Sequence, residues 1–460
     1  MISAIGLRLS RIFERVVPDP FVLAILLTAL AFILAIAFGD FGQDQTGVAE
    51  RAVASLDAWR GGDGLWRFLA FGMRMCLVLV TGHVLASSPP VRAVIDGLAK
   101  LPKGAASAAA LVGTVAALAG LVNWGLGLIV GALLAREVAR GLSVRGVAHH
   151  YPLIVAAGYM GLLVWHGGLS GSAPLTMAKP SEAAAVLPAG FDEYALAGVE
   201  LSRTLGSGLN IVATGGLIVL VPLVLMLLAP KPGACRGIDA FEPPVDAQDS
   251  SAVARSLPEW LEHTRWLSWL LALGLFAGVG RYVSISGIGS VGLDEINATM
   301  LALGLIAQGS IASYIRAAES GARGCAGIIL QFPLYAGIMG VLSASGLIAS
   351  FSAWVASVGG ANSDVLMYLS AAVVNLFVPS GGGQWGIQGP VALQAAADAG
   401  IDPARMIMAV AYGDQLTNML QPFWALPLLA VTGVKAKDIV GYTAIVMLVA
   451  AVWTVGVLMI

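Results

Sequence analysis

Long apolar stretches separated by short polar segments occupy most of the chain. They cover residues 21–38, 65–86, 151–166, 207–228, 266–283, 298–314, 325–347, 406–434 and 439–458. Most are close to the roughly 20 residues that cross about 30 Å of hydrocarbon as a helix. Their hydrophobicity is continuous and does not alternate, which argues against a β-barrel. The pattern therefore predicts an all-α polytopic membrane protein with about nine full spans.

Two further apolar stretches are typical of re-entrant hairpins, which enter the membrane and return to the same side. The first, residues 105–139, turns at Asn123-Trp124-Gly125 and has cations at both ends, so both ends are expected in the cytoplasm. The stretch is either two full spans with a tight external turn or one re-entrant hairpin. Its return limb of roughly 9 to 13 residues is too short to cross the bilayer comfortably, which favours the hairpin. The second hairpin, residues 365–397, is expected to turn at residues 379–385.

Two of the spans are interrupted by glycine and polar residues. Residues 151–178 are broken at 167–174, and residues 406–434 are broken at 413–418. Unwound backbone inside a membrane is tolerated where it is buried in protein or lines a cavity. The two interruptions therefore indicate a binding site near the middle of the membrane.

The order of these features repeats along the chain. Asn123-Trp124-Gly125-Leu126 matches Gln384-Trp385-Gly386-Ile387, and Leu169-Ser170-Gly171 before Pro174 matches Leu416-Thr417-Asn418 before Pro422. Flanking charges predict opposite orientations, so the sequence predicts two inverted repeats, each with a re-entrant hairpin and a discontinuous helix. The expected parts are a first repeat (1–229), a cytoplasmic linker (230–265), a connecting span (266–297) and a second repeat (298–460). This pattern is typical of secondary transporters.

Composition and charge agree with a membrane protein. The chain of 460 residues is 58% hydrophobic and 11% charged, whereas soluble domains carry about 25% charged residues. Its net charge of −2 gives no sign of a nucleic-acid partner, and three separated cysteines suggest neither a disulfide framework nor a metal site. Arg8, Arg11 and Arg15 precede the first stretch, which predicts a cytoplasmic N-terminus, a retained first span and an external, periplasmic C-terminus.

Four blocks of this sequence resemble the bacterial short-chain fatty acid transporters of the ion transporter superfamily, of the acetoacetate/butyrate permease type. They read LVNWGLGLIVGALLAREVA, HGGLSGSAPL, VPSGGGQWGIQGP and YGDQLTNMLQPFWALPLL. The resemblance implies carriage of small monocarboxylates across the inner membrane, driven by a Na⁺ or H⁺ gradient. It also implies a scaffold domain, a mobile transport domain and a homodimer.

The candidate substrate-binding residues lie at the hairpin tips and helix breaks. Their backbone N–H groups and half-helix termini attract a carboxylate, although small residues also permit close helix packing. They are Asn123, Trp124, Gly125, Ser170, Gly171, Ser172, Ser380, Gly381, Gly382, Gly383, Gln384, Thr417 and Asn418.

Asp414 is the main candidate for ion coupling, because a carboxylate within a span is costly and usually functional. Asn123, Asn418 and His166 join it as ion-coupling candidates, and a structural pair remains the alternative for Asp414 and His166. Arg74 is either a counter-charge for an anion or a structural partner. The only cofactor considered is Na⁺, whose candidate ligands are Asn123, Ser170, Ser380, Thr417 and Asn418.

Two other functions compete with a transporter. His166-Gly167-Gly168 with Ser170 is similar to an esterase segment, but a serine hydrolase needs a strand–turn–helix elbow that the helical context lacks. Hairpins and broken helices could also form a channel for small anions. The inverted layout favours alternating access, and we expect no enzymatic activity.

Overall fold

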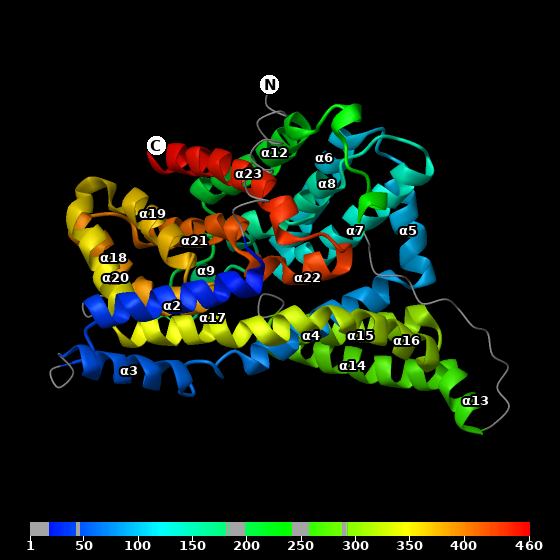
Figure 1. Ribbon diagram of the computed structural model, residues 1–460, viewed down its shortest axis with the longest axis horizontal. Coiled ribbons are helices and arrows are strands. Elements are labelled where there is room, and N and C mark those ends of the chain that lie inside the picture. The colour runs from blue at the N-terminus through cyan, green and yellow to red at the C-terminus, as the bar shows by residue number, and fades with distance from the viewer. Residues whose placement is uncertain are drawn as a thin grey trace.

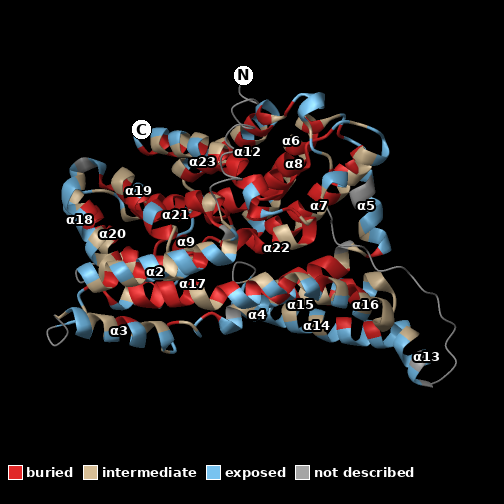
Figure 2. Cartoon of the chain, in the orientation of Figure 1, coloured by how far each residue is buried: buried red, intermediate tan, exposed pale blue. Residues whose placement is uncertain are grey.

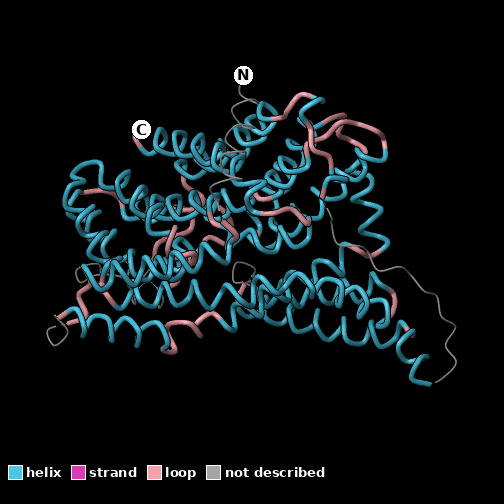
Figure 3. Tube along the Cα trace, in the orientation of Figure 1, coloured by secondary structure: helices cyan, strands magenta, loops and turns pink. Residues whose placement is uncertain are grey.

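The computed structural model describes residues 18–42, 47–180, 183, 198–241, 257–287, 291 and 293–460. Within these ranges every regular element is a helix, and Figure 3 shows loops passing through the interior of the molecule. The expected basic flank at Arg8, Arg11 and Arg15 lies outside the described residues.

The helices follow one another with short connections. The first part of the chain forms α2 (Pro20–Phe38), α3 (Val48–Arg60), α4 (Leu69–Ala86), α5 (Pro89–Ala99), α6 (Ala105–Val122), α7 (Trp124–Val144), α8 (Tyr151–Gly158), α9 (Ser172–Ala178) and α12 (Gly208–Leu228). The second forms α13 (Leu257–His263), α14 (Arg265–Ser286), α15 (Leu293–Gln308), α16 (Ile311–Ala322), α17 (Ala326–Ala344), α18 (Leu347–Gly359), α19 (Ser363–Asn375), α20 (Gly381–Ala399), α21 (Pro403–Thr417), α22 (Pro422–Thr432) and α23 (Ala436–Leu458).

Among the described residues, six helices are long and apolar enough to cross a membrane, and a bent pair formed by α4 and α5 would make a seventh. The six are Pro20–Phe38, Ala105–Val122, Gly208–Leu228, Arg265–Ser286, Ile311–Ala344 and Ala436–Leu458. The predicted all-α membrane class is therefore confirmed. The expected spans at 151–166 and 406–434 are divided into shorter helices, so their count as full spans stays a prediction.

The helices form two layers, which Figure 1 shows one above the other. The lower layer contains α2, α3, α4 and α14 to α17, and the upper layer contains α6 to α9, α12 and α19 to α23. Helix α17 packs against α2, α3 and α4, whereas α22 contacts α17 and α4 across the layers. Each layer therefore combines helices from both halves of the chain.

Burial differs between the centre of the molecule and its outer helices. Figure 2 shows buried residues concentrated along α7, α8, α21 and α22, with α3 and α14 largely exposed. Helix α14 exposes Trp266, Leu270 and Leu273. Such apolar side chains suit contact with lipid, because hydrocarbon accepts them as readily as a protein core does.

The first hairpin differs from its prediction in the length of its return limb. Helix α7 has 21 residues and continues past Arg136 and Arg140 to Val144, so the expected short limb was wrong. Arginine, glutamate and alanine are good helix formers, and charge alone does not end a helix. The two limbs have similar lengths, because α6 has 18 residues.

The second hairpin turns earlier than predicted. Helix α20 begins at Gly381, so three glycines form its first turn and Trp385 lies inside the helix, not at the tip. The hydroxyl of Ser380 accepts a hydrogen bond from the Gly383 N–H at 3.2 Å, which caps the helix start. The expected turn at 379–385 is therefore corrected to 376–380.

The positions of both helix breaks differ from those that the sequence predicts. The first break, expected at 167–174, starts and ends earlier than predicted: α8 ends at Gly158, two short 3₁₀ turns follow at Met160–Leu163 and Trp165–Gly167, and α9 begins at Ser172 after the non-helical residues 168–171. The second break lies at residues 418–421, because α21 stays helical through Thr417, so the expected break at 413–418 began too early. A Cβ at Gly413 would lie 2.1 Å from the Tyr368 carbonyl oxygen, so this glycine permits close packing of α21 on α19.

Another difference concerns the expected spans at 298–314 and 325–347. The first is interrupted between α15 and α16 at Gly309, whose φ of 75° is in the left-handed region that favours glycine. Helices α16 and α17 instead join, through a 3₁₀ turn at Arg323–Cys325, into one apolar stretch of 34 residues, Ile311–Ala344.

Glycines bring α7 and α8 into backbone contact. A Cβ at Gly131 would lie 2.0 Å from the Gly158 carbonyl oxygen, and one at Gly158 would lie 2.6 Å from the Gly131 carbonyl oxygen. Small residues allow helices in membranes to approach this closely. The first hairpin and the first broken helix are thus held together by their backbones.

The part of the linker at residues 230–241 docks on two histidines that precede α8. The Arg236 N–H donates to His150 Nδ1 at 3.0 Å, and the Ile238 N–H donates to His149 Nε2 at 3.1 Å. His150 Nε2 lies 2.8 Å from the Tyr442 hydroxyl of α23. A histidine nitrogen that accepts a hydrogen bond carries no proton, so this docking requires both rings to be neutral.

Burial and the neighbouring positive charges favour the neutral form of His150. Burial first, and then the charges of Arg236 and His149, lower the pKa of His150 from 6.5 to about 4. Asp438 of α23 faces the same site from the other side, 3.5 Å from Arg236. Because the folded-state pKa is depressed, the stability that docking contributes is present above about pH 6.5 and is lost as the pH falls towards 4.

We expect the thermal unfolding midpoint of the detergent-solubilised protein to fall less steeply between pH 7 and pH 4.5 in His150→Gln than in the wild type. The wild type must protonate His150 against its environment, which amounts to about 3 kcal/mol by pH 4. His263→Gln on α13 serves as the control and should keep the wild-type slope. Equal slopes for His150→Gln and the wild type would contradict the prediction.

Candidate functional site

The two hairpin tips and the two helix breaks meet at the centre of the molecule. The Trp124 N–H of the first tip donates to Ser170 Oγ of the first break at 3.0 Å. At the second tip, a Cβ on Gly381 would lie 2.8 Å from both His166 Cε1 and Ser172 Oγ. Segments far apart in sequence thus contact one another directly.

His166 and Asp414 connect the first break to the second broken helix. His166 Nε2 lies 3.0 Å from Asp414 Oδ1, and the residues are 1% and 3% exposed. His166 Nδ1 accepts a hydrogen bond from the Ser172 N–H at 3.3 Å. With Nδ1 as acceptor, the neutral ring carries its proton on Nε2 and donates it to the Asp414 carboxylate.

The second oxygen of Asp414 distinguishes this pair from an ordinary ion pair. Among the described residues Asp414 Oδ2 is buried and has no hydrogen-bond partner. With His166 neutral, the pair carries one negative charge, and burying such a charge without compensation is costly. The arrangement suits the uptake of one positive charge, as a proton or a monovalent cation.

Asn375, at the end of α19, is a central residue that the sequence analysis missed. The two hydrogens of its amide nitrogen are shared among three acceptors, the Asp414 carbonyl oxygen at 2.5 Å, Thr417 Oγ1 at 3.1 Å and Asn418 Oδ1 at 2.9 Å. The backbone carbonyl oxygen of Asn375 accepts a hydrogen bond from the Gln421 side chain. Asn375 therefore holds the end of α21 in place. An amide within the apolar run 365–378 was the only signal for it.

Asn210, on α12, has the same role at the first break and was also missed. Its amide nitrogen donates to the Gly167 carbonyl oxygen at 2.9 Å, and its oxygen accepts from the Tyr412 hydroxyl at 3.0 Å. Gln415 Oε1 completes the support by accepting from the His166 N–H at 3.0 Å. Side-chain amides from neighbouring helices thus satisfy the interrupted backbone.

Asn123 and Trp124 shape the first hairpin tip. Asn123 Oδ1 accepts a hydrogen bond from the Gly125 N–H at 2.8 Å and caps α7. The Trp124 ring packs edge-on against Trp165 and Trp424, with centroids 6.3 and 5.0 Å away. The tip is therefore held by a cap and by aromatic contacts.

Two of the remaining predicted substrate residues have structural contacts, and a third borders open space. A Cβ on Gly171 would lie 2.3 Å from the His166 carbonyl oxygen, so a larger residue would disturb the first break. Gln384 donates to the Ala371 carbonyl oxygen at 2.9 Å and joins the limbs of the second hairpin. Gly382 has no atom within 4 Å of its Cβ position, so it borders open space.

The five candidate Na⁺ ligands fall into three groups according to their hydrogen bonds. Asn123 and Ser170 lie at the first hairpin tip, Ser380 caps α20, and Thr417 and Asn418 surround Asn375. The third group, with the Asp414 carbonyl oxygen, surrounds the Asn375 side-chain nitrogen, so a cation bound by these three oxygens would take the place of that amide. Hard cations prefer such oxygen ligands.

Arg74 lies away from the four segments. It forms a two-point ion pair with Asp294, with N···O distances of 2.7 and 2.9 Å, and its side chain is 46% exposed. The pair joins α4 to the start of α15 in the lower layer. Arg74 is therefore placed as a structural partner of Asp294.

Comparisons with known proteins agree over the whole chain. A family model described as "Short chain fatty acid transporter" matches residues 1–460. Two bacterial proteins carry the description "Putative short-chain fatty acid transporter". One, from Escherichia coli (strain K12), is 38% identical over 448 residues, and the other, from Haemophilus influenzae, is 35% identical over 454 residues. Each alignment covers 96% of this chain and 96% of the relative.

Two solved structures show a weak likeness. The YdaH transporter of Alcanivorax borkumensis is 16% identical with a TM-score of 0.42, covering 95% of this chain and 98% of that one. The efflux pump MtrF of Neisseria gonorrhoeae is 14% identical with a TM-score of 0.35, covering 98% of this chain and 96% of that one. At these TM-scores the likeness carries no argument about the fold.

Gly381→Ala should destabilise the protein by about 1–3 kcal/mol, because the added methyl group must displace the His166 ring or Ser172. Gly382→Ala is the matched control, since its methyl group enters open space. Thermal unfolding of the two variants in the same detergent measures the difference. Equal midpoints would show that the second tip does not press on His166.

Proposed function

Since the chain belongs to the short-chain fatty acid transporter family, we propose that it is a secondary active transporter of small monocarboxylates such as butyrate or acetoacetate, coupled to a Na⁺ or H⁺ gradient. The observation that carries the coupling proposal is the buried His166–Asp414 pair between the two broken helices, with one carboxylate oxygen unpartnered among the described residues.

In this proposal the substrate carboxylate binds among the hairpin tips and helix breaks. The first N–H groups of α20, at Gly381 and Gly382, have no acceptor within their own helix and favour an anion. The open space beside Gly382 leaves room for one. Ser172 lies beside this tip, and Ser170 contacts the first tip through the Trp124 N–H, so each tip has a serine hydroxyl group close to it.

The charge of the His166–Asp414 pair links anion binding to cation binding. A carboxylate about 4 Å from a buried negative charge meets a repulsion on the order of 4 kcal/mol at an effective dielectric constant of 20. A proton on the pair removes this repulsion. A Na⁺ ion that took the place of the Asn375 amide among the Asp414 carbonyl, Thr417 and Asn418 oxygens would also weaken it. The anion and one cation then favour each other's binding, as symport requires.

We assign the motion to the upper layer, which contains both hairpins, moving against the lower layer as scaffold. The close contact of Gly131 with Gly158 supports movement of the first hairpin together with α8. Repeats at 1–229 and 298–460, joined by the linker 230–265 and the connecting span 266–297, would give the two inverted halves. The expected setting is the bacterial inner membrane with the N-terminus inside.

The two competing functions have less support. For a serine hydrolase, the acceptor nitrogen of His166 faces the Ser172 N–H, and Ser170 Oγ accepts from the Trp124 N–H. No described contact pairs a serine hydroxyl with the histidine as base, which nucleophilic catalysis needs. A channel for small anions is the remaining alternative, and transport kinetics would distinguish it from a transporter.

Purified protein in proteoliposomes should accumulate labelled butyrate when a Na⁺ or pH gradient is imposed, and uptake should saturate. The two gradients are applied separately to identify the coupling ion. Protein-free liposomes correct for passive entry of the protonated acid. Absence of gradient-dependent uptake for every short carboxylate tested would refute the transporter proposal, and unsaturable flux would favour the channel.

Asp414→Asn should abolish gradient-driven accumulation, with a loss of roughly tenfold or more, while exchange of butyrate across the membrane persists. The amide keeps the shape of the side chain but removes its negative charge. Asp294→Asn, at the exposed pair with Arg74, is the matched control and should transport normally. Full coupled accumulation by Asp414→Asn would exclude Asp414 from coupling.

A further inference from the structure

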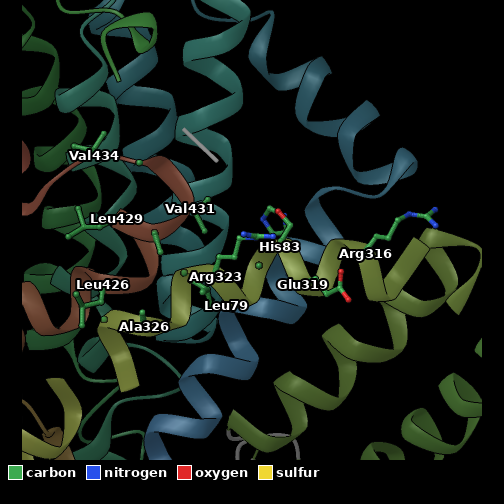
Figure 4. Close-up of a pocket in the computed structure, with 16 residues that line it drawn as sticks. Leu79, His83, Arg316, Glu319, Arg323, Ala326, Leu426, Leu429, Val431 and Val434 are labelled. Atoms are coloured by element: carbon green, nitrogen blue, oxygen red, sulfur yellow. The ribbon is translucent and has the colours of Figure 1, made fainter. Parts of the chain in front are cut away.

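A large cavity lies between the two layers, beside the junction of α16 and α17. Its volume is about 940 Å³, and it is separate from the residues of the central site. One wall carries four ionisable side chains, His83, Arg316, Glu319 and Arg323. Figure 4 shows Arg323 extending from the junction towards His83 of α4, with the apolar face of α22 opposite. Ligand sites in proteins commonly have volumes of about 300–1,000 Å³.

The charges around this cavity place it on the cytoplasmic side. Arg316 and Arg323 line it, and Lys435 and Lys437 lie one and three residues after Val434, which ends its opposite wall. Clusters of lysine and arginine beside membrane helices mark the cytoplasmic face. The cavity therefore opens where a solute from the cytoplasm would enter.

Both walls of the cavity lead towards the central site. Along α22, Leu426 lines the cavity and lies four residues from Pro422, where the helix starts after the second break, or about 6 Å of helix rise. Along α17, Gly327 lines the cavity and lies five residues from Phe332, or about 7.5 Å. The two walls meet where Phe332 stacks on Phe423, with centroids 4.1 Å apart.

The aromatic contact continues from this stack to the first hairpin tip. Phe423 also contacts Tyr335 at 4.9 Å and Trp424 at 5.0 Å, and Trp424 contacts Trp124 at 5.0 Å. These rings come from α17, α22 and the tip of the first hairpin. They lie between the cavity and the centre where the four segments meet.

Arg323 is available to a ligand. Its side chain is exposed, and among the described residues it forms no ion pair. Arg316, by contrast, donates to Ser313 Oγ at 3.1 Å. A cation without a protein partner in a cleft raises the local concentration of anions, because the low-dielectric walls focus its field.

We propose that this cavity is the cytoplasmic mouth of the transport route, where Arg323 attracts the carboxylate of the short-chain acid before it passes the Phe332–Phe423 stack. The inference rests on the proposed function and adds an entry site to it. Arg323 acts by long-range attraction at an exposed position, so its effect depends on ionic strength. The aromatic stack is the barrier that must separate when the upper layer moves.

The first test uses proteoliposomes of defined orientation, with butyrate supplied to the cytoplasmic side. Arg323→Gln should raise KM roughly three- to tenfold at low salt and leave kcat unchanged, whereas Arg323→Lys should restore KM. The increase should shrink towards none at high salt, because ions screen the attraction. Arg265→Gln, a cation at the start of α14 outside the cavity, is the matched control.

The outcomes separate this inference from the proposed function. Normal wild-type transport with an unchanged KM in Arg323→Gln at every salt concentration would overturn the entry site alone. If KM increased in Arg323→Gln by the same factor at every salt concentration, Arg323 would not act by long-range attraction. If the wild type transports no carboxylate at all, the proposed function is refuted, and so is the assignment of the cavity as the entry to a transport route.

A second test needs no transport. Ser320, which lines the cavity, is changed to cysteine in a Cys235→Ser background, since Cys76 and Cys325 are buried. An anionic methanethiosulfonate reagent should label Ser320→Cys faster than its cationic analogue, and Arg323→Gln should remove this preference. Butyrate should slow the labelling. If anionic lipid vesicles slow it and butyrate does not, the cavity holds a lipid headgroup and the proposal is wrong.

Discussion

Interrupted helices inside a membrane depend on one constraint: every exposed backbone N–H and C=O group must find a partner within the protein, because lipid supplies none. Side-chain amides meet this constraint here. Asn210 binds the Gly167 carbonyl oxygen, and Asn375 binds the Asp414 carbonyl oxygen. Gln415 accepts the His166 N–H. The breaks therefore exist because helices distant in sequence supply amides, and the meeting of the four segments follows from those hydrogen bonds.

Much of the architecture could be predicted from the sequence, because glycine, proline and amides inside apolar runs mark hairpins and breaks. The boundaries were less accurate, since Ser380 caps a helix that begins with three glycines and charged residues extend α7. The hydrogen-bond partners could not be predicted. Tyr412 donates to Asn210, which lies 202 residues away in the sequence, and no local pattern encodes that pairing. The candidate residues were found as clusters, but which of them touch depended on packing.

Two kinds of contact join the helices near the site. Backbone contact between Gly131 and Gly158 leaves α7 and α8 no freedom to slide, because the atoms interlock at a fixed register. The layers instead meet through the rings of Phe332, Phe423 and Trp424. Side chains can change rotamer and let one surface pass another. Rigid units and a deformable boundary between them are what a rocking movement needs.

The continuous stretch Ile311–Ala344 also sets a depth scale. Its 34 residues extend about 51 Å, whereas the hydrocarbon core is about 30 Å thick, which some 20 residues of helix cover. Counted from Ala344, those 20 residues end near Gly324, so an upright helix brings Arg323 to the level of the lipid headgroups. The remaining turns of α16, with Arg316 and Glu319, then extend into water beside the cavity. A tilted helix would draw the same residues back into the bilayer, so helix tilt would control how far the cavity reaches the cytoplasm.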